Sequence, residues 1–255
     1  MLLNYRIIGQ GPPLIILHGL FGSLDNWMGI AKHLAVNSTV YLVDLRNHGQ
    51  SFHHQKFNYE VMAKDLGILM DDLDVTDYAI LGHSMGGKVA MFHTVRNPDR
   101  IKKLIVVDIA PKKYPVGHQQ ILDGLSSINP KELTSRRQAD DLLNKFVHEP
   151  GIRQFLLKNL KRTSNKSFEW NINLKVINDQ IDEVGKALPA NKLIEIPTLF
   201  IRGGLSKYIN EEDYSAIHLQ FPQSTISTVP EVGHWVHAEA PQVFLEMVQK
   251  FLHQS

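Results

Sequence analysis

Short, continuous apolar runs recur along the chain and are separated by longer stretches of mixed character. A continuous run, as opposed to an alternation of apolar and polar residues, is typical of a strand covered on both faces in a parallel sheet. Such runs lie at Leu14–Leu17, Val40–Val43, Tyr78–Leu81, Leu104–Val107 and Thr198–Ile201, with a further strand expected at Thr225–Val229 and an edge strand at Leu2–Ile8.

The stretches between these runs have the period of amphipathic helices. In Tyr59–Leu73 the apolar residues recur at steps of three and four, and Asn58 precedes them as a suitable N-cap. Further helices are expected at Asp25–Ala35, Gly86–Arg96 and Glu211–Gln220, and in a last helix that starts at Pro241. Strands and helices in alternation predict an α/β fold with a mostly parallel central sheet and flanking helices.

The alternation is interrupted once. Between Pro111 and Thr198 lie 86 residues, whereas a crossover with a single helix needs only about 30. The sequence therefore predicts a core formed by residues 1–111 and 191–255 with an inserted cap at 112–190. Helical patterns within the cap lie near Gln119–Ser127, Ser135–Val147, Ile152–Leu160 and Leu174–Leu188.

Composition narrows the class of protein. With 27 Lys and Arg against 26 Asp and Glu, the net charge is +1, so nothing favours nucleic acid or an anionic membrane as partner. Cysteine is absent, which excludes disulfides and a thiol nucleophile. No 18-residue apolar run and no basic-then-apolar leader is present. We expect a cytoplasmic protein without membrane insertion, a monomer or homodimer that acts on a small molecule.

Charge is unevenly divided between core and cap. Residues 112–190 carry 13 Lys and Arg against 9 Asp and Glu, a balance of +4 that leaves −3 for the rest of the chain. A solvated helical surface explains such a balance in most cases. The alternative is a site that attracts an acidic or phosphorylated ligand.

The segment Leu81–Gly87 (L-G-H-S-M-G-G) joins a buried strand to an amphipathic helix through a serine between two glycines. Ser84 falls on the turn, where the backbone is strained and its neighbours must be small. Gly82 and Gly86 meet that need. The pattern G-x-S-x-G in this strand–turn–helix context predicts a nucleophile elbow.

In open α/β sheets, ligands bind at the carboxyl ends of the strands. The residues that follow each strand should therefore meet, namely His18–Phe21, Ser84, Asp108, Ser206 and His234. Serine, acid and histidine in this chain order match the order found in α/β-hydrolases.

The whole chain resembles the α/β-hydrolase superfamily in the motifs H-G-L-F-G at 18–22, D-L-R-N-H-G-Q-S at 44–51, G-H-S-M-G at 82–86, D-I-A-P at 108–111 and G-H-W at 233–235. Within it, H-G-L-F-G-S-L-D-N is most similar to small bacterial esterases related to mitochondrial abhydrolase-domain proteins. That resemblance implies hydrolysis of short- to medium-chain acyl esters and thioesters by a serine triad. No metal or cofactor is implied.

The triad acid is where the sequence departs from many relatives. They place it after the strand that here ends at Ile201, but Arg202–Ser206 holds no carboxylate. We therefore predict Asp108 as the acid, a position that the resembling esterases also use, with Ser206 supporting it or the histidine. The alternative is that Asp108 caps a turn before Pro111.

Acyl-transfer chemistry assigns the roles. Ser84 attacks the carbonyl, His234 takes and returns the proton, and Asp108 orients the imidazole. The oxyanion needs donors already in place, which the backbone amides of Met85 and Leu20, with Phe21 as a further candidate, supply in this hypothesis.

Other conspicuous residues have more ordinary explanations. We expect His18 and His83 to hydrogen-bond neighbouring loops, and the histidine pairs lack a metal signature such as H-E-x-x-H. Aromatic residues that line an acyl pocket or simply pack in the core are Phe21, Trp27, Phe155, Trp170 and Trp235.

The leading hypothesis is a serine hydrolase of esters or acyl thioesters, acyl-coenzyme A among them. A carbon–carbon bond hydrolase or a cofactor-free perhydrolase would use the same triad, because specificity resides in the pocket. A non-catalytic receptor with a hydrolase fold is the alternative from another class.

Overall fold

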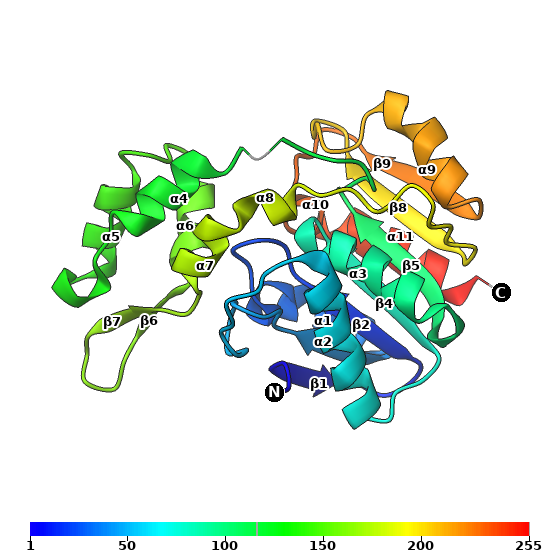
Figure 1. Cartoon of the computed structure of the whole chain (residues 1–255), viewed down its shortest axis with the longest axis horizontal. Coiled ribbons are helices and arrows are strands. Elements are labelled where there is room, and N and C mark those ends of the chain that lie inside the picture. Colours follow the sequence, from blue (N-terminus) through cyan, green and yellow to red (C-terminus); the bar gives the residue numbers. More distant parts are fainter. Residues whose placement is uncertain (116, 255) are drawn as a thin grey trace.

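A seven-stranded sheet forms the centre of the computed structural model, which describes residues 1–115 and 117–254. β1 pairs antiparallel with β3 at the edge, and the other neighbours are parallel. The mostly parallel sheet expected from the apolar runs is confirmed (Figure 1). In spatial order the strands are β1 (Tyr5–Ile8), β3 (Thr39–Val43), β2 (Pro13–Leu17), β4 (Tyr78–His83), β5 (Ile101–Val107), β8 (Thr198–Gly203) and β9 (Ser224–Val229).

Helices cover both faces of this sheet, and each continuous apolar run contributes side chains to the core on both faces. In β2, Ile15 and Leu17 belong to the core on one face, whereas Leu14 and Ile16 belong to the core on the other. The first face is covered by α2 (Tyr59–Asp72), α3 (Met85–Arg96) and α9 (Tyr214–Gln220), and the second by α1 (Met28–Leu34), α10 (Val236–Glu239) and α11 (Pro241–His253). The side chains of a strand alternate between faces, and because both faces are covered, these runs do not alternate between apolar and polar residues.

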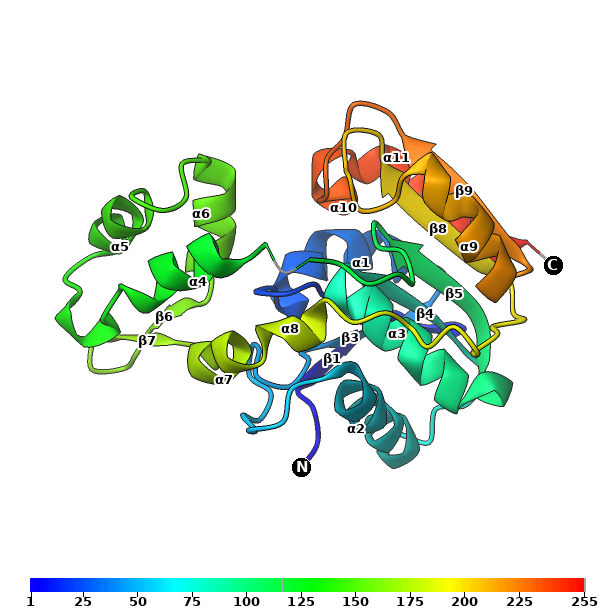
Figure 2. The same ribbon diagram turned by 45° about the horizontal axis from the view of Figure 1, so that its top comes forward.

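The cap segment lies between β5 and β8 and stands beyond the sheet (Figures 1 and 2). It holds α4 (Gln119–Ser126), α5 (Arg136–Leu143), α6 (Pro150–Leu157), β6 (Leu160–Arg162), β7 (Phe168–Trp170), α7 (Leu174–Asp179) and α8 (Ile181–Val184). Among the described helices, none combines the length and the apolar character that crossing a membrane requires.

The cap differs in two details from the all-helical expectation. β6 and β7 form an antiparallel hairpin, and the polar residues 163–167 supply its turn, with Lys166 at φ 67°. The helix expected over residues 174–188 is broken at Gln180, whose side-chain oxygen accepts a hydrogen bond from the Phe57 amide at 2.9 Å.

The two ends of the cap segment lie side by side. The Tyr114 amide donates to Gly185 O, and the Leu188 amide donates to Pro111 O, both at 2.8 Å. Lys88 of α3 is completely buried, and its Nζ donates to Lys112 O at 2.6 Å and Lys186 O at 2.8 Å. One buried amine on the helix that follows Ser84 therefore binds both cap linkers.

Candidate active site

Ser84 sits on a strained turn between β4 and α3, with φ 52° and ψ −118°. Backbone approaches around it leave no room for larger neighbours. A Cβ at Gly82 would lie 2.2 Å from Gly86 O, and one at Gly86 would lie 2.5 Å from both Leu17 O and His18 O. The glycines therefore permit a turn that presents the serine at the carboxyl edge of the sheet.

Asp108 follows β5 and is fully buried. Its Oδ1 accepts a hydrogen bond from the Gly203 amide at 3.0 Å, and its Oδ2 accepts from Ser206 Oγ and from His234 Nδ1, the latter at 2.7 Å. None of these donors belongs to the turn before Pro111, so this geometry favours the role of imidazole partner over that of a turn cap. Ser206, in the position vacated by the usual acid, binds Asp108 and not the histidine.

His234 is held from several sides. Because Nδ1 faces the Asp108 carboxylate, the proton lies on Nδ1 and Nε2 is left as the basic nitrogen. The Tyr208 ring stacks on the imidazole with 4.0 Å between centroids, and His83 Nε2 donates to His234 O at 2.9 Å. Burial keeps the pKa of His83 well below its usual value, so this neighbour adds no charge.

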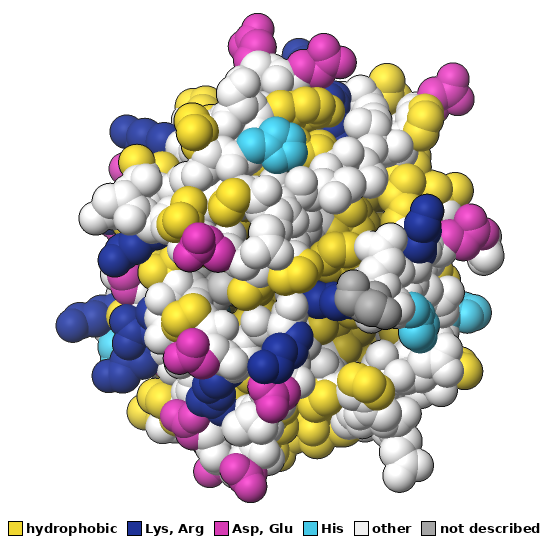
Figure 3. All heavy atoms as spheres, turned by 90° about the vertical axis from the view of Figure 1, so that its right-hand side faces the viewer, with side chains coloured by type: hydrophobic (Ala, Val, Ile, Leu, Met, Phe, Trp, Pro, Cys, Tyr) yellow, Lys and Arg dark blue, Asp and Glu magenta, His cyan; other side chains and the backbone are white. Residues whose placement is uncertain are grey.

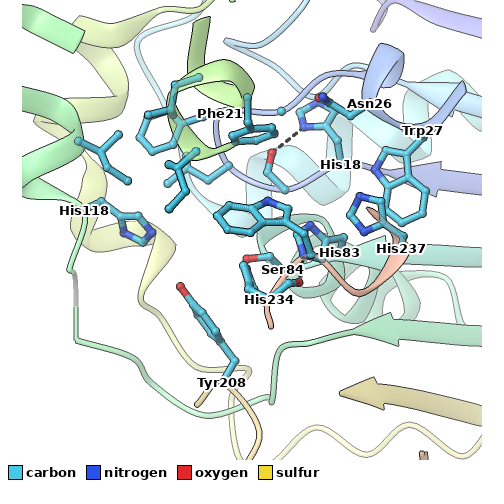
Figure 4. A pocket seen from close by; sticks show the side chains of 18 of the residues that line it. His18, Phe21, Asn26, Trp27, His83, Ser84, His118, Tyr208, His234 and His237 are labelled. Carbon is cyan, nitrogen blue, oxygen red and sulfur yellow. Dashed lines mark hydrogen bonds between the residues drawn. The ribbon is translucent and has the colours of Figure 1, made fainter. Parts of the chain in front are cut away.

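Ser84 and His234 line one cavity (Figure 4). No hydrogen bond joins Ser84 Oγ to the imidazole among the residues that the structure describes. Catalytic hydrogen bonds are often long in free enzymes and tighten when substrate binds.

Hydrogen bonds to Gly19 O fix the orientation of the peptide group that also carries the Leu20 N–H. Gly19 O, at the other end of that peptide, accepts from the Gly22 amide at 3.0 Å and from His18 Nδ1 at 2.8 Å. His18 Nε2 accepts from the Leu45 amide at 3.0 Å, which fixes the neutral tautomer. Burial lowers the pKa of His18 and favours the same form. The loop role expected for His18 thus extends to positioning the Leu20 amide, a candidate oxyanion donor.

The Phe21 amide is already occupied, since it donates to His48 Nε2 at 3.3 Å. This hydrogen bond favours Leu20 over Phe21 as the oxyanion donor from this loop, and both assignments stay predictions. Met85 is the first residue of α3, so its N–H has no acceptor within the helix. Leu20 and Met85 are left as the candidate pair.

Two cavities meet at Ser84. The first, of about 270 Å³, is mainly apolar, and Figure 4 shows Ser84 and His234 in the middle of its labelled side chains. Its apolar lining combines core and cap residues, namely Leu20, Phe21, Trp27, Ile121, Ile152, Phe155, Leu156 and Trp235. The second, of about 430 Å³, is lined in part by Tyr59, Tyr114, Lys112, Lys113 and Lys207.

Charge on the side of the core away from the cap is mixed. The face in Figure 3 carries acidic and basic side chains around a middle where hydrophobic side chains are exposed. Within residues 1–115 and 117–254, no group of three or more His, Asp or Glu side chains is placed to hold a metal ion.

Sequence reasoning missed His48, Tyr208 and His118. His48 lies in the 44–51 motif, but the motif does not indicate its role, because its bond to Phe21 joins residues 27 positions apart. His118 comes from the cap and lines both cavities with Tyr208.

Comparison with known proteins gives the class. Residues 12–241 match the family described as alpha/beta hydrolase fold. The chain is 37% identical over 246 residues to a putative esterase/lipase of Haemophilus influenzae, covering 96% of this chain and 84% of that protein. It is 37% identical over 252 residues to the sn-1-specific diacylglycerol lipase ABHD11 of Danio rerio, covering 96% and 79%.

A solved structure of a marine microorganism esterase superposes with a TM-score of 0.95 at 40% identity, covering 98% of this chain and 99% of that one. The chain belongs to the α/β-hydrolase fold family. Together with the relatives' names, this makes it an enzyme of the carboxylic ester hydrolase class.

Proposed function

We propose that this enzyme cleaves short- to medium-chain carboxylic esters or acyl thioesters through an acyl-enzyme on Ser84. The observation that carries the proposal is the hydrogen bond of 2.7 Å between buried Asp108 and His234, which lines one cavity with the strained Ser84. Esterase and lipase relatives that align with 96% of this chain support it.

Each step of the reaction uses a side chain or a backbone amide of this site. His234 Nε2 takes the Ser84 proton as Oγ attacks the carbonyl carbon, and the Leu20 and Met85 amides stabilise the oxyanion. His234 then protonates the departing alcohol or thiol. Water repeats the sequence and releases the acid, while Asp108 stabilises the imidazolium without itself being protonated.

The two cavities suggest how the substrate lies. The apolar cavity beneath Phe155 and Trp235 suits the acyl chain. The second cavity suits the leaving group. Lys112 is paired there with Asp213 at 2.7 Å, and the remaining charge of Lys113 and Lys207 favours an anionic leaving group such as coenzyme A. Comparing an acyl-coenzyme A with an uncharged thioester of equal chain length tests this: equal kcat/KM would remove the coenzyme A proposal.

Steady turnover of p-nitrophenyl acetate or butyrate tests the proposal as a whole. We expect Ser84→Ala and His234→Ala each to lose at least about 1,000-fold in kcat. Rates near wild type in both variants would reject the assignment. A wild type that binds esters without turning them over would favour the receptor alternative. Cytoplasmic location and the monomer or homodimer stay predictions.

A further inference from the structure

The cap reaches the oxyanion loop through one buried amide. Asn159 follows α6 in the cap and is 5% exposed. Its Nδ2 donates to Phe21 O at 2.7 Å and to Leu156 O at 3.1 Å. A side-chain amide has two N–H donors. One of them binds Leu156 O at the end of α6 within the cap, and the other binds Phe21 O in the core loop.

Phe21 is a residue that needs such support. Its φ of 60° lies in the left-handed region, which a bulky residue adopts only when its surroundings impose it. The carbonyl is held by Asn159 and the amide by His48 Nε2. Burial lowers the pKa of His48 to about 3, so its Nε2 remains an acceptor at neutral pH.

His48 is itself tied to the cap. It forms an isolated β-bridge with Ile172, and the Asn173 amide donates to Asn47 O at 2.9 Å. The cap therefore holds Phe21 directly through Asn159 and indirectly through the loop that carries His48. Both contacts are made one residue away from Leu20, a candidate oxyanion donor.

We propose that Asn159 is a positioning residue for the oxyanion hole, and that docking of the cap through this side chain keeps the Leu20 amide aimed at the reacting carbonyl. The inference rests on the proposed function, because it assigns the Leu20 amide a role in acyl transfer. In this view the cap does more than wall the pocket: it sets part of the catalytic rate.

The test compares Asn159→Leu, which keeps the size and removes the donor, with Asn159→Asp, which places a carboxylate oxygen against Phe21 O. The control is Asn144→Leu, because Asn144 Oδ1 accepts from Arg153 Nη1 at 2.8 Å wholly within the cap. Removing an oxyanion donor typically costs about 100- to 1,000-fold in kcat. For a donor misaligned but present we expect a loss of about 10- to 100-fold for p-nitrophenyl acetate, with KM changed by less than about threefold.

A second readout separates the oxyanion hole from general damage. An aryl trifluoromethyl ketone places its hemiketal oxygen in the hole, so its inhibition constant should rise in proportion to the loss in kcat/KM. Binding of the matching carboxylic amide, which forms no oxyanion, should stay within about threefold of wild type. Equal losses for both ligands, or equal losses in Asn144→Leu, would overturn the inference.

Hydrogen exchange gives a measure that does not need turnover. In Asn159→Leu the peptide spanning residues 18–22 should exchange at least about tenfold faster than in wild type, because the loop loses its anchor. Unchanged exchange in folded Asn159 variants would reject the inference even if esters are hydrolysed. Absence of wild-type esterase activity, with faster exchange in the variants, would instead reject the proposed function and keep the anchoring contact.

If neither Asn159 variant folds, Asn173→Ala provides the remaining test. It removes a side-chain donor to Asn47 Oδ1 at 3.2 Å and leaves Asn159 in place. A smaller loss in kcat with a parallel rise in the ketone inhibition constant supports the inference. A loss confined to KM overturns it.

Discussion

Asp108 shows how three donors can decide the chemistry of one imidazole. Gly203 and Ser206 orient the carboxylate, and the remaining bond selects the His234 tautomer with Nε2 free. Because Asp108 is fully buried, it depends on these partners for stabilisation of its charge. Loss of the Asp108 carboxylate should therefore lower activity more than loss of the Ser206 hydroxyl that orients it.

We expect Asp108→Asn to lower kcat by about 10⁴-fold, because an amide permits the wrong histidine tautomer. Ser206→Ala removes one hydrogen bond to the carboxylate and should lower kcat by less than about tenfold. Steady-state kinetics with p-nitrophenyl butyrate measures both. A deeper loss in Ser206→Ala than in Asp108→Asn would show that the acid has been misassigned.

Lys88 gives a prediction about stability against pH. Burial, with the charge of Lys112 nearby, lowers the pKa of Lys88 from 10.5 to about 7. Between these values the unfolded chain binds the extra proton and the folded chain does not, so the free energy of unfolding should rise with pH. The rise is at most about 1.4 kcal/mol per pH unit.

Denaturant unfolding of wild type and Lys88→Met between pH 7 and 9 measures this rise. The free energy of unfolding of wild type should increase with pH relative to that of Lys88→Met. Met91→Leu on the same buried helix is the control and should leave the slope unchanged. A difference that stays constant with pH would contradict the prediction. The neutral amine still has two N–H groups for its two carbonyl acceptors, so the linkers stay bound.

At the residue scale, the meeting of Ser84, Asp108 and His234 could be predicted, because each lies within a few residues of the carboxyl end of a predicted strand. His48 and Asn159 could not, because their roles depend on contacts across 27 and 138 positions. The hydrogen bond of the Phe21 amide could not be predicted either, because a sequence does not show which acceptor a backbone N–H will meet.

At the element scale, the elbow depends on how closely β2 approaches α3. Gly86→Ala would place a methyl group 2.5 Å from two carbonyl oxygens of residues 17 and 18. Backbone atoms cannot move aside cheaply, so we expect a loss of several kcal/mol in stability, on the scale of severe overpacking, or no folded protein.

Gly29→Ala is the matched control. Gly29 lies in α1 with nothing within 4 Å of an added Cβ, so alanine should raise stability by about 0.5–1 kcal/mol. Thermal unfolding compares the two. Similar melting temperatures for both variants would show that the close approach at the elbow is less restrictive than described.

The strands were the most predictable elements, because burial on both faces leaves an unbroken apolar run. The hairpin β6–β7 was not, since its three-residue strands are too short to show a period. The break between α7 and α8 was also hidden, because the apolar pattern continues past Gln180 while a contact with Phe57 decides the backbone there.

At the scale of the whole molecule, core and cap share the apolar cavity. Phe155 of the cap faces Trp235 of the core with 5.8 Å between ring centroids. Phe155→Ala should lower kcat/KM for hexanoyl esters by about 10-fold or more relative to acetyl esters, because a longer chain loses more apolar contact. A panel of p-nitrophenyl esters measures the ratio.

Val147→Ala serves as the control for a buried cap residue outside the cavity lining. It should change stability and leave the chain-length ratio near that of wild type. An unaltered ratio in Phe155→Ala would place the acyl chain elsewhere.

The presence of further elements between β5 and β8 could be predicted, because a gap of 86 residues is too long for one crossover. The docking of the cap could not, because pattern and spacing carry no information about which cap residue meets which core loop. The family resemblance supplied the fold and the reaction class but not the anchoring by Asn159.

The chain leaves the core and returns to it at adjoining points, joined by the paired amides of Tyr114 and Leu188. Because its two ends are adjacent, we expect that the segment 112–190 can be exchanged as a unit without moving the strands of the core. Grafting the corresponding piece of a relative would preserve the sheet and its nucleophile while transferring a different substrate range, provided that the donor brings its own amide to the position of Asn159.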